Sequence, residues 1–106
     1  MAEFVKVCKV GDIAEGGRHW FEFEDETVVI FNVGGRFYAI ADVCTHDGGP
    51  LEEGELDGYE VECPRHGARF DIRDGDAVRL PAVTPVPCYR TRVEGDDLLL
   101  ESPDAW

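Results

Sequence analysis

Short runs of alternating apolar and polar residues follow one another along most of the chain. Residues 4–10 partly alternate and are rich in valine, and residues 19–23 have an extended character. β-Branched and aromatic residues at a period of two are typical of strands. No amphipathic helix longer than about two turns is indicated. The pattern therefore predicts an all-β fold that begins with strands at 4–10 and 19–23.

The clearest expected hairpin surrounds a pair of glycines. The apolar runs 27–33 and 36–41 flank Gly34-Gly35. Two glycines adopt without strain the positive φ angles that a tight two-residue hairpin turn requires. We therefore predict two antiparallel strands joined at Gly34-Gly35.

The amino-acid composition of the chain changes between about residues 42 and 75. Glycine and proline accumulate there, and only residues 59–62 and 68–72 have the composition of short strands. Three prolines between residues 81 and 87 predict a stiff loop that lacks backbone donors. A final hairpin is expected from residues 87–94 and 97–101. The pattern thus indicates an all-β base with a loop-built insertion at about 42–75.

Length and charge limit the possible functions. With 106 residues the chain fits one domain, 1–106, and its 10 basic against 23 acidic residues give a net charge of −13. Such a surface repels phosphate backbones and anionic membranes, and it favours a basic patch on a protein partner. We therefore expect no nucleic-acid or membrane partner.

The cysteine count and the sequence termini bear on the compartment. No run approaches the 18 or so apolar residues of a membrane span, and the N-terminus lacks the pattern of a signal peptide. A cytoplasmic protein is therefore expected. In that reducing compartment four cysteines indicate metal binding or buried thiols before disulfides.

Two short motifs carry the candidate chemistry. The first is Cys44-Thr45-His46 and the second is Cys63-Pro64-Arg65-His66, with sixteen residues, 47–62, between His46 and Cys63. Two thiolates and two imidazoles suit either a tetrahedral zinc ion or a mixed-ligand iron–sulfur cluster. Zinc sites usually place two cysteines on one turn and two histidines on a helix, whereas here each turn carries one of each. This distribution fits a dinuclear cluster.

The motifs resemble those of the Rieske [2Fe–2S] family, and the resemblance extends from the first strand through the glycine hairpin to the closing hairpin. It implies a Rieske-like antiparallel β-sandwich or barrel base with a small cluster-binding subdomain. It also implies that one iron is bound by Cys44 and Cys63, and the other by His46 and His66 through Nδ1. Pro81 resembles part of the loop that covers the cluster.

Some positions depart from the high-potential branch of that family. Gly49 and Arg65 stand where the branch has two disulfide-forming cysteines, and Ala68 and Phe70 stand where it has hydroxyls that donate to the cluster. Because such donors raise the potential, their loss predicts a low-potential centre. The resemblance then favours a soluble ferredoxin over a quinol oxidase subunit.

The resemblance implies a one-electron carrier that links a flavin reductase to a terminal oxygenase. A monomer is the default expectation for a small shuttling carrier. No separate catalytic constellation is found, so no enzymatic activity of its own is expected. The alternatives are a small subunit of a nitrite reductase-like or iron–sulfur assembly system, and a zinc-stabilised or metal-free β-domain scaffold.

Five further residues attract attention without belonging to the ligand set. Cys8 and Cys88 fall on expected strands, where buried thiols are ordinary, and they would approach each other if the first and last strands were neighbours. His19 is expected to be a strand side chain. Arg65 and Arg69 flank the second motif, where docking, tuning of the cluster and a solvated salt bridge are all open.

Overall fold

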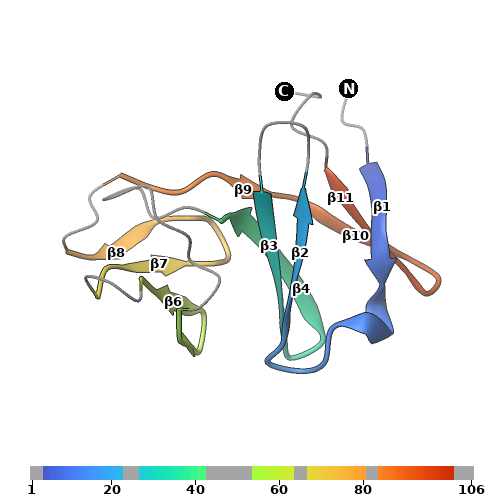
Figure 1. The fold of residues 1–106 in the computed structure, drawn as a ribbon, viewed down its shortest axis with the longest axis horizontal. Helices are drawn as coiled ribbons and strands as arrows, with labels where there is room; N and C mark the ends of the chain where they lie inside the picture. Colours follow the sequence, from blue (N-terminus) through green and yellow to red (C-terminus); the bar gives the residue numbers. More distant parts are fainter. Residues whose placement is uncertain (1–3, 23–26, 43–53, 64–66, 81–83, 102–106) are drawn as a thin grey trace.

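The computed structural model describes residues 4–22, 27–42, 54–63, 67–80 and 84–101. Within these ranges the chain forms strands and one 3-10 turn, Val10–Asp12, arranged as three antiparallel sheets (Figure 1). The described residues thus confirm the all-β prediction. No helix in these ranges is long and apolar enough to cross a membrane.

The first sheet joins the two ends of the described chain. It consists of β1 (Phe4–Lys9), β11 (Asp97–Glu101) and β10 (Thr91–Glu94), in the order β1-β11-β10. The register of β1 against β11 shifts between Lys6 and Cys8. Residues far apart in sequence are therefore neighbours in this sheet, which a local pattern cannot reveal.

The second sheet contains the glycine hairpin. Its strands are β2 (Arg18–Glu22), β3 (Thr27–Val33), β4 (Arg36–Ala41) and β9 (Cys88–Tyr89), in sequential order. The hairpin between β3 and β4 is confirmed, with φ angles of 64° and 82° at Gly34 and Gly35. Both glycines therefore use the left-handed region that the expected turn requires.

The third sheet lies to one side of the other two (Figure 1). It contains β5 (Leu56–Asp57), β6 (Glu60–Glu62), β7 (Arg69–Asp71) and β8 (Ala77–Arg79), again in sequential order. The short strands expected at 59–62 and 68–72 correspond to β6 and β7. The sequence pattern missed β5 and β8, whose two and three residues give too little periodicity to detect.

The expected strand at 87–94 is divided between two sheets. Cys88 and Tyr89 pair with β4, whereas the chain from Thr91 onward pairs with β11. Arg90 lies between the two strands and its carbonyl accepts a hydrogen bond from the Glu101 amide at 2.9 Å. The prediction of one continuous strand is therefore wrong, because the segment links two sheets.

A single cluster of buried side chains draws on all three sheets. Val28, Val29, Ile30 and Phe31 of β3 are all fully buried, so both faces of this central strand are covered. A strand covered on both faces has a continuous apolar run instead of an alternating one. In the third sheet Val61 and Phe70 contribute to the same core.

Candidate metal centre

Cys63 immediately follows β6 and begins the loop that carries the second motif. Its side chain is 1% exposed. The Cys63 amide donates to the Ala68 carbonyl at 2.6 Å, and the Gly67 amide donates to the Cys63 carbonyl at 3.1 Å. Gly67 has a φ of 73°, which lets the chain reverse there. The two ends of the loop are thus fastened together by backbone hydrogen bonds.

The other three expected ligands, Cys44, His46 and His66, lie outside the described residues. The described chain does fix the approach to the first motif. The Ala41 amide donates to the Pro87 carbonyl at 2.9 Å, and the Asp42 amide donates to the Thr27 carbonyl at 2.9 Å. The chain is therefore held in the second sheet up to two residues before Cys44.

The donor chemistry of the Cys63 loop suits a metal centre. The Cys63 thiol forms no disulfide, and it sits at the base of a short loop whose sequence also supplies an imidazole. A thiolate and an imidazole are ligands for zinc or for a mixed-ligand iron–sulfur cluster. Among the described residues no group of three metal-ligating side chains comes together, and only one of the four expected ligands is described.

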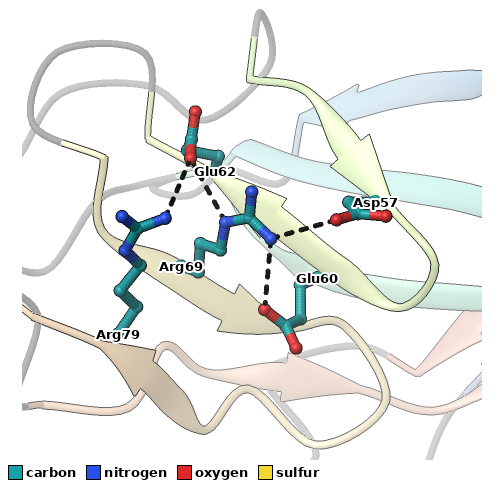
Figure 2. Close-up of polar contacts among 5 residues, drawn as sticks. All are labelled: Asp57, Glu60, Glu62, Arg69 and Arg79. Atoms are coloured by element: carbon teal, nitrogen blue, oxygen red, sulfur yellow. Dashed lines mark hydrogen bonds and ion pairs between the residues drawn. The ribbon is translucent and has the colours of Figure 1, made fainter.

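An ion-pair network occupies one face of the third sheet beside this loop (Figure 2). The Arg69 Nε donates to Glu62 Oε1 at 3.2 Å, and its Nη1 donates to Asp57 Oδ2 at 3.2 Å and lies 3.6 Å from Glu60 Oε1. Arg79 Nη1 lies 3.7 Å from the same Glu62 oxygen. Hydrogen bonds to Glu62 and then Asp57 raise the pKa of the Arg69 guanidinium.

The sequence predicted part of this network. Arg69 was singled out as a neighbour of the second motif, and a salt bridge was one of its three open roles. Its carboxylate partners were missed. The signal was available in principle, because Glu62 and Arg69 bracket the loop and are directly opposite in the register.

A second polar cluster joins the third sheet to the second. Arg73 donates to both carboxylate oxygens of Asp71, through Nε at 3.0 Å and Nη2 at 2.7 Å. This guanidinium lowers the pKa of Asp71, against the opposing effect of burial. Arg73 also lies 4.3 Å from the centroid of the Tyr59 ring, and Tyr59 meets Tyr38 of β4 edge to face.

The two cysteines outside the motifs lie in different sheets. β1 and β11 are indeed neighbours, and Cys8 lies opposite Leu98 of β11. Cys88, however, belongs to β9 and lies opposite Ile40. The expected burial holds only partly, since Cys8 is half-buried and Cys88 is exposed. Burial, followed by the charge of Asp12, raises the pKa of the Cys8 thiol.

The remaining candidate, His19, is a strand residue of β2 opposite Ile30, as expected. An open groove of about 740 Å³ is lined by residues that include Tyr38, Ile72 and Arg90. Cys63 is not among the described residues that line it. The described lining of this groove is therefore separate from Cys63, the one candidate ligand that the structure describes.

Comparison with known proteins identifies the family to which the motifs point. Residues 3–90 match the Rieske [2Fe-2S] domain family. The ferredoxin component of biphenyl 2,3-dioxygenase from Rhodococcus jostii (strain RHA1) is 42% identical over 96 residues, which cover 91% of this chain and 90% of that protein.

Solved structures give the same result. The ferredoxin of carbazole 1,9a-dioxygenase from Nocardioides aromaticivorans IC177 superposes with a TM-score of 0.87 at 32% identity, covering 92% of this chain and 95% of that one. A chain in the complex of reduced oxygenase and oxidized ferredoxin of carbazole 1,9a-dioxygenase also gives a TM-score of 0.87, at 30% identity and 92% coverage of both chains.

Proposed function

The chain belongs to the Rieske [2Fe-2S] domain family, and from this premise we propose that it is a ferredoxin that carries single electrons from a reductase to a terminal oxygenase. Its strongest support is the similarity to a dioxygenase ferredoxin component over nine-tenths of both chains. A similar solved structure is a complex of reduced oxygenase and oxidized ferredoxin, and an oxygenase is the kind of acceptor that we propose here.

The cluster ligands that we propose are Cys44, His46, Cys63 and His66. Cys63 fits this role because its thiol is buried and its loop is closed by backbone hydrogen bonds. The bound cluster would supply a centre that accepts and releases one electron. The protein would contribute the ligands, the shielding of the thiolates from water and the charges around them.

The chain would act as a carrier and not as a catalyst. Its sequence offers no nucleophile with an adjacent base, no phosphate loop and no dinucleotide fingerprint. We further propose that it is a single domain and a monomer, located in the cytoplasm, where its cysteines stay reduced. The one core shared by all three sheets supports the single domain.

Reductive titration tests this function. The purified protein is titrated anaerobically with dithionite and then mixed with the oxidised terminal oxygenase of a biphenyl or carbazole dioxygenase. We expect uptake of one electron per chain and its transfer to the oxygenase. A Cys63→Ala variant should take up none, whereas Cys88→Ala, which removes an exposed thiol, should behave as wild type. A wild-type protein without a reducible centre would contradict the proposal.

A further inference from the structure

Arg69 occupies the centre of a side-chain network that reaches every strand of the third sheet. Its guanidinium contacts Asp57 of β5 and the two glutamates of β6, and Arg79 of β8 shares the Glu62 carboxylate (Figure 2). Its own strand is β7. Because Arg69 makes several contacts in one network, its contribution to stability is larger than that of an isolated surface ion pair.

The register explains how one side chain reaches so many strands. Asp57 lies opposite Glu60, Glu62 opposite Arg69, and Arg69 opposite Arg79. Directly opposed residues project from the same face of a sheet. The other face holds Val61 and Phe70, which are opposite each other and fully buried. One face of the sheet therefore packs in the core, and the other is held by the network.

The network lies at the foot of the Cys63 loop. Glu62 immediately precedes Cys63, and Arg69 immediately follows Ala68, whose carbonyl accepts the Cys63 amide at 2.6 Å. The Glu62–Arg69 ion pair thus joins β6 to β7 at the last pair of opposed residues before the loop begins. Any separation of these two strands would move Cys63 directly.

The charge balance makes Arg69 hard to replace. The five side chains comprise three carboxylates and two guanidiniums, so the formal charge of the network is already −1. Without Arg69, Asp57, Glu60 and Glu62 would face one another with Arg79 as the only cation of the network. Like charges on directly opposed or diagonal positions destabilise strand pairing. The side chain of Arg69 is 25% exposed and that of Glu62 is 31% exposed, so solvent screens this pair only partly.

We propose that Arg69 is a positioning residue for the cluster: its guanidinium fork fixes the base of the Cys63–Ala68 loop to the four-stranded sheet. This inference rests on the proposed function, because it concerns the ligand loop of the same centre. Arg69 would act through Glu62 and the strand pairing, without touching the cluster.

Two substitutions separate geometry from charge. Arg69→Lys keeps the charge but loses the planar fork whose separate nitrogens, Nε and Nη1, donate to Glu62 and Asp57, whereas Arg69→Gln removes the charge as well. We expect both variants to release iron to a chelator about tenfold faster than wild type. Only Arg69→Gln should also lower the reduction potential, because the added negative charge disfavours the electron.

Arg36→Gln is the matched control. Arg36 is an exposed arginine at the start of β4, in another sheet, and its substitution changes the net charge of the protein by the same amount. Its iron release should match that of wild type. The EPR spectrum of reduced Arg69→Lys should broaden, because a loosened loop holds the ligands in more than one geometry, and that of Arg36→Gln should not.

The outcomes distinguish the inference from the proposed function. If wild type binds a cluster but Arg69→Lys releases iron at the wild-type rate with an unchanged EPR spectrum, the positioning role is overturned and the carrier function stands. If wild type binds no cluster, both fail. If neither Arg69 variant folds, Glu62→Gln removes the charge of the partner instead. Iron release from Glu62→Gln must then be faster than iron release from wild type for the inference to hold.

Discussion

The ring of Tyr59 meets the ring of Tyr38 edge to face, with centroids 5.7 Å apart and ring planes at 85°. Tyr59 lies in the turn between β5 and β6, and Tyr38 lies on β4. Arg73 covers the Tyr59 ring at 4.3 Å. The Tyr59 side chain therefore adds a surface contact between the sheet of the candidate metal centre and the sheet of the glycine hairpin, which also share the buried core.

Removal of this ring should loosen the connection. We expect Tyr59→Ala to lower the free energy of unfolding by about 1–2 kcal/mol, from the lost edge-to-face and cation–π contacts. Tyr59→Phe keeps the ring and should remain within about 0.5 kcal/mol of wild type. Urea unfolding followed by circular dichroism measures both. Equal stability of Tyr59→Ala and wild type would show that the contact does not contribute.

Gly75 should tolerate no side chain. It has a φ of 83°, and a Cβ there would run into the carbonyl oxygen of Val86, whose amide donates to the Gly75 carbonyl at 2.8 Å. Gly58 has a φ of 61° but open space around it, which makes it the matched control.

We expect Gly58→Ala to cost about 1 kcal/mol, from the left-handed backbone alone. Gly75→Ala should cost about 3 kcal/mol or more, because the backbone cost is joined by overpacking. Thermal unfolding of the two variants gives the comparison. Similar unfolding temperatures for both would refute the close approach of residue 86.

Two other parts of the fold show how far the sequence alone predicts the structure. Gly34-Gly35 was identified correctly because a two-residue turn with positive φ is a local property of those two residues. The division of the expected strand at Arg90 was missed because it depends on which strand, β4 or β11, lies beside each half of the segment. Such pairing is decided by contacts distant in sequence.

The ligand set Cys44, His46, Cys63 and His66 stays a prediction, since the structure describes only Cys63 among the four. The spacing of cysteine and histidine in the two motifs indicates the ligand set without any structure. The network around Arg69 could not be derived in the same way, since β5 and β8 are too short for their strands to be recognised. Without those strands, neither Asp57 nor Arg79 can be placed beside Arg69.

Low pH should weaken the contribution of Asp71 to the stability of the fold. Its carboxylate accepts three hydrogen bonds from Arg73, and these hold its pKa below the ordinary value of 3.8. Because the folded-state pKa is the lower one, the stabilisation is fully present above the unfolded-state pKa. It is lost as the pH falls through the folded-state pKa.

The variant Asp71→Asn tests the direction of this pH dependence. At pH 7 we expect it to be about 1 kcal/mol less stable than wild type. The difference should begin to shrink as the pH falls from about 4 to about 3, around the unperturbed pKa of aspartate, because the unfolded chain takes up its proton there while the folded chain still holds the carboxylate. Urea unfolding of both proteins at each pH measures it. A constant difference over that range would mean that the ion pair does not matter.

An exposed apolar side chain at the end of β8, whose Arg79 lies opposite Arg69, is expected to contact the redox partner. Leu80 is 73% exposed and follows β8, an edge strand of the third sheet, on which Val78 is 48% exposed. Exposed apolar side chains that gather on one part of a surface are typical of interfaces. We expect Leu80→Asp to slow electron transfer to the terminal oxygenase about tenfold under second-order conditions.

Val93→Asp provides the control for that experiment. Val93 is 51% exposed on β10, in the sheet that joins the chain ends, and the substitution adds the same charge. Stopped-flow transfer rates should be close to wild type for this variant. Equal slowing by both variants would attribute the effect to net charge and not to a contact at Leu80.

The most direct test of the central claim is the EPR spectrum of the purified protein after dithionite reduction, recorded with iron and acid-labile sulfide analyses of the same sample. A cluster bound by two cysteines and two histidines predicts iron and sulfide in equal amounts. It also predicts a reduced signal whose mean g value lies below that of all-cysteine clusters. A colourless protein that holds zinc or no metal, even after anaerobic reconstitution with iron and sulfide, would contradict the claim and favour a scaffold module.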